Sequence, residues 1–372
     1  MKIKPMNIFI LTLIIAAVWA IGYLAYTLWF ELGRAPRQSI YQNEIETPQQ
    51  TGNFSYTNMI REMISPSNKN RTPPATIQHV QNDLTTLTQK ASSIVWFGHS
   101  SYLLTLDGFT ILVDPVMSGH SSPLPFLIKS FAGTDVYTVK DLPPIDVLLI
   151  THDHYDHLDY ETVSQLQSKV KRAIVPTGVG EHLRFWSYEP SQITELNWHD
   201  STTVDEHTFT AAPTRHFSGR GLTRNNTLWA SFIIKSPNHA IYVGGDSGYG
   251  PHFKAIGERY GPFDLAMLES GQYNENWRYI HMMPEETVQA AQDLNAQTLF
   301  PVHWGKFVLS LHDWDEPIKR LTQAASQRKQ ALLTPTLGQV VYLNNAYEDN
   351  PWWQSMSSTE PVKAEPKTFV SQ

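Results

Sequence analysis

Residues 151–157, with the sequence Thr-His-Asp-His-Tyr-Asp-His, constrain the fold of this chain more than any other stretch. They follow the apolar run 145–150, which is typical of a buried strand. Side chains at the end of a rigid strand are held at fixed distances from one another, as a metal site requires. Imidazole and carboxylate groups together suit zinc, and also iron or manganese. Because so dense a set cannot reach one ion without strain, we expect two groups to face one metal and two to face another, among His152, His154, Asp156 and His157.

Four later positions place a similar side chain just after a strand-like run, namely His216, Asp246, Glu269 and His303. Each position alone is weak evidence, because an aspartate among glycines is common in turns and a histidine beside a strand is commonly just hydrogen-bonded. In open α/β architectures, however, ligands gather at the ends of strands. The chain has no cysteine, so histidine and carboxylate must hold any metal. These additional positions argue against the alternative that residues 151–157 form only a polar surface loop.

The part of the chain between residues 93 and 343 mixes strand-like and helical patterns. Strands are expected at residues 93–97, 101–106, 110–113, 147–150, 173–175, 208–211, 231–234, 240–243, 265–268, 298–301 and 339–343. Helices are expected at residues 160–168, 180–185, 284–294 and 315–327. This mixture predicts an α/β fold in which helices cover mixed sheets.

The sequence of motifs resembles the metallo-β-lactamase superfamily: H-x-H-x-D-H, then a histidine, then an aspartate, then a histidine. The resemblance extends over residues 93–345 and implies an αββα sandwich with two metal ions, Zn²⁺ being favoured over Mn²⁺ or Fe²⁺. The family pattern implies that the first ion is bound by His152, His154 and His216. It implies Asp156, His157 and His303 for the second ion, and Asp246 as a bridge between the two.

Finer motifs look like the N-acyl-phosphatidylethanolamine-hydrolysing phospholipase D branch of this superfamily. They are W-F-G-H-S-S at 96–101, D-P at 114–115, H-Y-D-H-L-D-Y at 154–160, G-D-S-G-Y at 245–249 and R-Y-I-H-M-M-P-E-E at 278–286. The resemblance implies hydrolysis of a phospholipid phosphodiester, with His281 contacting the substrate phosphate region. Ile280 stands where well-known members carry glutamine, so the contacts to the head group are expected to differ.

Asp156, Asp246 and His281 are the expected catalytic residues. Either aspartate would orient the attacking water, and His281 is the candidate proton donor to the leaving group. His99 is either a group behind the metal ligands or a hydrogen-bonded histidine at a strand turn.

Substrate contacts are expected from Tyr160 and Trp186 as well as from His281, with Trp277 as a further cleft aromatic; the alternative for these aromatics is that they belong to the core. The apolar segment 116–137 is expected either to line or cap the cleft and touch acyl chains, or to pack on the core as an ordinary loop.

The N-terminal stretch from residue 6 to residue 30 is apolar and, at about 25 residues, long enough to cross a bilayer. It is longer than the apolar part of a usual signal peptide, so an uncleaved anchor is favoured over a cleaved signal. Lysines at positions 2 and 4 precede it, and arginines at 34 and 37 follow it. The positive-inside rule slightly favours a cytoplasmic N-terminus, which predicts a catalytic domain on the periplasmic or outer side.

Four regions are expected: a membrane anchor at 1–32, a tether with a short helix near 58–64 at 33–90, a hydrolase domain at 91–348 and a flexible polar tail at 349–372. The net charge of −7 argues against a nucleic-acid partner, and for the same reason against a nucleic-acid phosphodiesterase. The expected partners are the lipid bilayer and a phospholipid substrate. The alternatives are a lactonase or other ester hydrolase on the same metal site, and a tethered zinc-binding protein without turnover.

Overall fold

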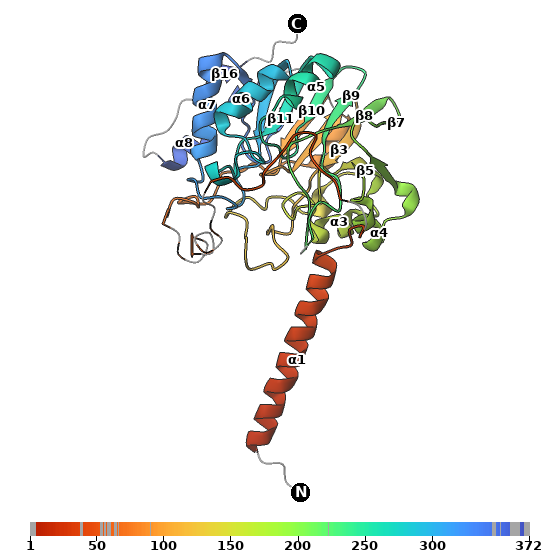
Figure 1. Cartoon of the computed structure of the whole chain (residues 1–372), viewed down its shortest axis with the longest axis vertical. Helices are drawn as coiled ribbons and strands as arrows, with labels where there is room; N and C mark the ends of the chain where they lie inside the picture. The colour runs from red at the N-terminus through yellow and green to blue at the C-terminus, as the bar shows by residue number, and fades with distance from the viewer. Residues whose placement is uncertain are drawn as a thin grey trace.

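The computed structural model shows two stacked β-sheets with helices on their outer faces and one long helix projecting from the body (Figure 1). It describes the chain except for residues 1–4, 38–39, 53–54, 56, 58–60, 63–64, 66, 90, 222, 344–346, 350, 358–364 and 368–372. Each of the two main sheets has seven strands. The layers confirm the predicted αββα sandwich.

The first sheet has the strand order β14-β1-β2-β3-β4-β5-β6. Its strands β3 to β6 are parallel, whereas β14, β1, β2 and β3 pair antiparallel. The strands are β1 (Ser93–Trp96), β2 (Tyr102–Leu106), β3 (Phe109–Val113), β4 (Ile145–Leu149), β5 (Val170–Pro176), β6 (Ile193–Leu196) and β14 (Val340–Tyr342). The helices packed on its outer face are α3 (Tyr160–Leu166) and α4 (Gly180–Phe185).

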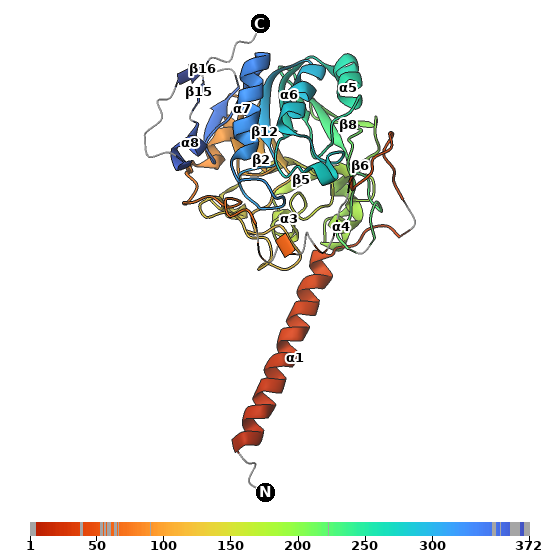
Figure 2. The same ribbon diagram turned by 60° about the vertical axis from the view of Figure 1, so that its left-hand side comes forward.

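The second sheet has the strand order β13-β12-β11-β10-β9-β8-β7. The strands are β7 (Ser201–Val204), β8 (His207–Ala212), β9 (Ser231–Lys235), β10 (Ala240–Val243), β11 (Phe263–Glu269), β12 (Ala296–Val302) and β13 (Ala331–Leu332). Its outer face is covered by α5 (His252–Tyr260), α6 (Pro284–Asp293) and α7 (Glu316–Arg328), as Figure 2 shows.

The remaining elements are short. The 3₁₀ helices are η1 (Leu84–Gln89), η2 (Val139–Asp141), η3 (Pro190–Gln192) and η4 (Glu275–Trp277). A small C-terminal hairpin joins β15 (Tyr347–Asp349) to β16 (Glu365–Lys367), and α8 (Trp352–Ser357) lies between these strands in the sequence.

The core is built by alternation along the strands. In β2, Tyr102 and Leu104 join the cluster between the two sheets, whereas Leu103 joins the cluster under α3 and α4. Successive side chains of a strand point to opposite faces, so a strand covered on both faces must be apolar throughout. All five residues of β2 are buried accordingly.

The strands and helices expected between residues 93 and 343 are all present with shifted ends, but β6, β7, β13 and α5 were not expected. β6 and β7 lie at the edges of their sheets, and β7 has the polar sequence Ser-Thr-Thr-Val with alternate residues exposed. An edge strand that faces water on one side lacks the apolar run by which a buried strand is recognised.

The boundaries of the domain are wider than the sequence indicates. In the expected tether, Ile77, Leu84 and Leu87 are buried against the body. In the expected flexible tail, Trp352 and Trp353 are buried, and Trp352 stacks on Trp304 at 5.4 Å between ring centroids. The prediction of a loose tail from residue 349 is therefore wrong for α8, because its two tryptophans complete the core. Most of the expected short helix at 58–64 lies outside the described residues.

The N-terminal helix α1 (Pro5–Glu31) has the length and composition of a membrane span or a signal sequence, and its apolar window is not buried in the protein. Its last turn is docked to the domain. The indole of Trp186 donates to the carbonyl of Phe30 at 3.0 Å, and Arg220 donates to the carbonyl of Glu31 through Nε at 2.8 Å and Nη2 at 2.7 Å. These donors satisfy carbonyls that a helix end leaves without partners.

Candidate metal centre

The polar side chains of the site follow the ends of neighbouring strands, where the two sheets present one common edge. The H-x-H-x-D-H run follows β4, and His216, Asp246 and His303 follow β8, β10 and β12. Gly245 allows this close approach: its φ is +59°, and a Cβ there would lie 2.9 Å from Cβ of Thr151. The fold thus converts positions far apart in the sequence into one cluster.

Three histidines form the first group. One ring nitrogen from each of His152, His154 and His216 lies within 4.8 Å of the others. Nε2 of His152 is 2.9 Å from Nδ1 of His154, which is 3.2 Å from Nε2 of His216. Burial lowers the pKa of His152 and His216 well below the usual value, so both rings are neutral and can act as ligands.

The second group contains the three predicted residues and one more histidine. Asp156, His157 and His303 are joined by His99, again with one donor atom from each within 4.8 Å. Oδ2 of Asp156 lies 2.8 Å from Nε2 of His99 and 3.2 Å from Nε2 of His303. Burial raises the pKa of Asp156, but its contacts with His157, His303 and His99 together outweigh burial and hold the pKa of this carboxyl well below its usual value.

Asp246 lies between the two groups. Its Oδ2 is 3.6 Å from Nε2 of His216 in the first group, and 3.2 Å and 3.1 Å from Nε2 of His157 and His303 in the second. A single carboxylate that faces both groups has the position that the family pattern implies for a bridging ligand. All seven predicted ligands are therefore brought together.

The donor set fits a pair of divalent ions. Nε2 of His157 and Oδ1 of Asp246 are buried and have no hydrogen-bond partner among the described residues. Buried polar atoms are almost always paired, so these two atoms fit a cation as their partner. Nitrogen and oxygen donors without thiolate suit zinc, iron or manganese alike.

Buried carboxylates behind the ligands fix the ring orientations. Asp114 accepts from the backbone N–H and the hydroxyl of Thr151 at 2.8 and 2.6 Å, and its Oδ2 is 2.8 Å from Nδ1 of His157. A carboxylate at the far nitrogen of a metal-binding histidine sets its tautomer and increases its basicity. Glu269, at the end of β11, has the same relation to His281, with Oε2 2.6 Å from Nδ1.

Comparison with known proteins agrees with this geometry. Residues 110–304 match the family described as the beta-lactamase superfamily domain. The uncharacterized protein Rv0906 of Mycobacterium tuberculosis is 45% identical over 267 residues, which cover 70% of this chain and 72% of that protein. The chain belongs to the metallo-β-lactamase superfamily. This confirms the predicted membership and places the chain among metal-dependent hydrolases.

One further relative and one solved structure with the same fold are informative for this member of the metallo-β-lactamase superfamily. N-acyl-phosphatidylethanolamine-hydrolyzing phospholipase D 1 of Caenorhabditis elegans is 30% identical over 269 residues, covering 66% of this chain and 74% of that protein. The solved structure of Igni18, a metallo hydrolase from Ignicoccus hospitalis, superposes with a TM-score of 0.52 at 20% identity, covering 68% of this chain and 98% of that chain. The second match supports the fold alone.

A cavity of about 370 Å³ opens over the metal-ligand cluster. His281 and Trp277 both line this cavity, which is where the sequence placed them. From the apolar segment 116–137, Ser121 lines the cavity, while Phe126 and Leu127 are exposed. Phe131 and Tyr137 of the same segment are buried in the core, so the segment reaches the cavity at one point, packs on the core at others and is exposed at its tip.

Tyr160 and Trp186 are not brought to this cavity, contrary to their expected contact with substrate. Both pack at the end of α1. Tyr160 stacks on Phe30 at 5.4 Å between ring centroids, and the indole N–H of Trp186 donates to the carbonyl of Phe30. They hold the helix to the domain instead.

Three residues of the site carried no firm prediction: His99, Asp114 and Glu269. His99 is fully buried with φ +53°, in a turn directly after β1, and it faces Asp156. A signal was available, because a Gly-His pair just after a buried strand repeats the placement of the other ligands. Glu269 stands at the end of β11 in the same way. Its role, holding the ring of His281, becomes visible only from its contact with Nδ1 of that histidine.

Proposed function

We propose that this protein is a membrane-anchored phosphodiesterase with two divalent ions, zinc being favoured, that acts on phospholipids similar to N-acyl-phosphatidylethanolamine. The observation that carries the proposal is the mixed lining of the cavity over the ligand cluster. Phe217, Trp277, Ile280 and Leu309 supply apolar wall, while Arg224 supplies a cation. Arg224 donates to the neutral amide oxygen of Gln49, so its charge stays available for an anion.

The chain's own residues account for most of the proposed chemistry. Arg224 binds a phosphate oxygen, and the apolar wall holds the first part of an acyl chain. His281, held by Glu269 through Nδ1, keeps Nε2 on the opposite side of its ring and delivers a proton to the leaving alkoxide. Two divalent ions in such a site supply Lewis acidity toward phosphoryl oxygens and acidify water. Asp156 and Asp246 orient the attacking water.

The relatives support a phospholipid over other esters. The phospholipase D of Caenorhabditis elegans shares 30% identity with this chain over 269 residues. Phe126 and Leu127 are exposed on the segment that also supplies Ser121 to the cavity, and such apolar side chains suit a substrate that leaves a bilayer.

A hydrolysis screen tests the substrate class. We expect the full-length protein in detergent to hydrolyse N-acyl-phosphatidylethanolamine and, more slowly, a soluble aryl phosphodiester, and to leave β-lactams intact. A chelator should abolish the activity. Adding back zinc, manganese or iron in separate samples then shows which ion restores it best. Rapid lactone opening with untouched phosphodiesters and phospholipids would replace the proposal by the lactonase alternative. Metal binding without turnover on any of these substrates would favour a tethered zinc-binding protein.

We further propose that α1 is an uncleaved anchor and that the catalytic domain lies on the periplasmic or outer side. Because the chain has no cysteine, a single Asp205→Cys substitution introduces a unique thiol at an exposed position of the domain. We expect a membrane-impermeant maleimide to label this variant in cells whose outer membrane has been made permeable and whose inner membrane is intact. Labelling only after complete lysis would place the domain in the cytoplasm.

A further inference from the structure

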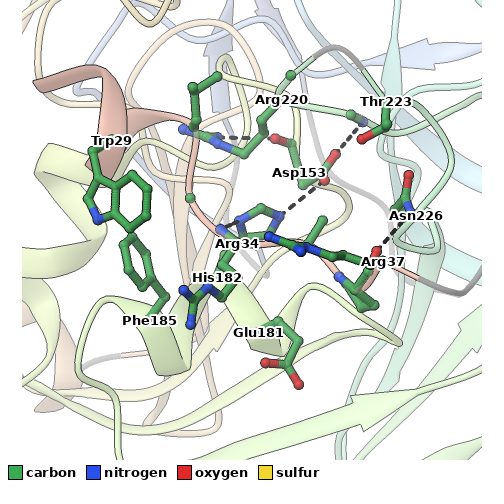
Figure 3. A pocket seen from close by; sticks show the side chains of 16 residues that line it. Trp29, Arg34, Arg37, Asp153, Glu181, His182, Phe185, Arg220, Thr223 and Asn226 are labelled. Atoms are coloured by element: carbon green, nitrogen blue, oxygen red, sulfur yellow. Dashed lines mark hydrogen bonds and ion pairs between the residues drawn. The ribbon is translucent and has the colours of Figure 1, made fainter. Parts of the chain in front are cut away.

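A second and larger cavity, of about 860 Å³, lies where α1 meets the domain (Figure 3). Trp29 in the last turn of α1 and Leu32 just after it line one part, and Phe185 from α4 lies beside Trp29, with ring centroids 5.9 Å apart. Arg34 and Arg37, from the segment after α1, also line it. The metal-ligand cluster does not line this cavity, so it is a separate site.

The two acidic side chains of the cavity already have partners. Glu181 pairs with Arg184 at 2.9 Å. Asp153 is buried and accepts from the backbone N–H of Gly219 at 2.7 Å and the hydroxyl of Thr227 at 2.9 Å, and it lies 3.3 Å from Nε2 of His182. Neither carboxylate is therefore available to neutralise the exposed arginines of the lining.

The two exposed arginines have no such partners. Arg34 packs its guanidinium over the ring of Phe185 at 5.3 Å, and its backbone N–H donates to Nδ1 of His182 at 2.9 Å. Among the described residues, neither Arg34 nor Arg37 forms an ion pair with a carboxylate. The cavity thus presents two positive charges in a chain whose net charge is −7.

The depth of the cavity in a bilayer follows from the length of α1. The helix has 27 residues, which at about 1.5 Å per residue span roughly 40 Å, more than the roughly 30 Å of hydrocarbon in a bilayer. Its C-terminal end therefore reaches the level of the lipid head groups. Trp29 lies near this end, and tryptophan is enriched at that level in membrane proteins.

We propose that this cavity binds the head-group phosphate of an anionic phospholipid, with Arg34 and Arg37 contacting the phosphate and Trp29 and Leu32 contacting the glycerol and upper acyl region. The inference rests on α1 being the membrane anchor proposed above, and it adds a lipid site separate from the catalytic cavity. A lipid held there fixes the orientation of the domain on the membrane surface, because α1, α4 and residues 219–221, 223 and 226 all contribute to the cavity wall.

Native mass spectrometry of the full-length protein in detergent tests the proposal, with phosphatidylglycerol as the anionic probe and phosphatidylcholine as the zwitterionic one. We expect tighter binding of phosphatidylglycerol to the wild type, and an affinity lower by roughly tenfold or more in the double variant Arg34→Gln, Arg37→Gln. The matched control is Lys254→Gln, Arg259→Gln, which removes the same charge from exposed positions on α5, at the far end of the domain from α1 (Figure 1). The control should bind like the wild type.

Several outcomes would overturn the inference. Unchanged phosphatidylglycerol affinity in the Arg34, Arg37 variant would show that the arginines are not the site. Displacement of the lipid by an equal concentration of inorganic phosphate would show a site for soluble anions instead. Extraction of membranes with alkaline carbonate separates the two proposals. If the wild type stays in the membrane without preferring phosphatidylglycerol, the anchor stands and the cavity proposal fails; if it washes out, the anchor fails and this inference with it.

Discussion

Asp246→Asn is expected to lower metal content and to abolish hydrolysis, with a loss in turnover of more than roughly 100-fold, since removing even a partner of a metal ligand costs about 10- to 100-fold. Oδ2 of Asp246 faces His216 of the first ligand group and His157 and His303 of the second. A neutral amide at this position cannot offset the charge of two cations. Asparagine keeps the shape of the side chain, so the buried backbone around it should remain folded.

Elemental analysis and turnover, measured on the same preparation, check this prediction. The matched control is Asp205→Asn, which removes one carboxylate from an exposed turn between β7 and β8 and should leave both readouts unchanged. Two ions per chain and wild-type turnover in Asp246→Asn would show that this residue is no bridge. Less than one ion per chain in the wild type, after supplementation with zinc, would refute the metal centre itself.

The ligand set could be predicted because its signals are local. The H-x-H-x-D-H run places four ligand groups on one strand end, and His216, Asp246 and His303 each follow a strand whose apolar run is plain in the sequence. Strands of one sheet that run the same way present their carboxyl ends at one edge, which brings His216, Asp246 and His303 together after β8, β10 and β12. The run after β4 belongs to the other sheet, and its meeting with them follows from the stacked sheets that the family resemblance implies.

The second layer of the site could not be assigned in this way. Whether His99 faces a ligand or only a turn depends on where β1 lies relative to β12. The backbone N–H of His303 donates to the carbonyl of His99, and the N–H of His99 donates to the carbonyl of Trp304, so these bonds join the two sheets. The role of Glu269 depends on the loop that returns His281 to it. Such contacts are tertiary, and a pattern of residue types does not specify them.

The aromatic residues show the same limit. From the sequence, Tyr160 and Trp186 could equally line a cleft or pack in a core. In the structure both contact Phe30 at the end of α1, so they pack against the helix. Trp352 and Trp353 lie in a stretch of polar composition, yet they bury themselves against Trp304 beside the metal centre. Composition describes the average of a segment, whereas two large side chains are enough to order it.

His281→Asn is expected to keep the fold and the metals but to lower turnover by roughly 10²- to 10⁴-fold, the usual contribution of a general acid or base. His281 lines the catalytic cavity and is only partly buried, and its ring centroid lies 5.1 Å from those of His216 and His303. Its Nδ1 is held by Glu269 at 2.6 Å, which leaves Nε2 as the nitrogen able to exchange a proton with substrate. An asparagine amide can still donate to Glu269, so the buried carboxylate keeps a partner while the proton donor is lost.

Metal content, turnover and the pH dependence of turnover together decide the role of His281. The matched control is His199→Asn. His199 is half-exposed, and its Nε2 lies 3.5 Å from Oε1 of Glu44. Its backbone is left-handed, with φ +72°, and asparagine tolerates that conformation. If His281→Asn loses one ion, His281 is a ligand and the assignment of His303 must be revised, because Asp246, Glu269, His281 and His303 also lie close enough to hold one ion. If it keeps both ions and full turnover, the proton reaches the leaving group by another route. Loss of turnover with both ions in place, together with loss of one limb of the pH profile, is the result that a proton donor requires and that a merely structural histidine would not give.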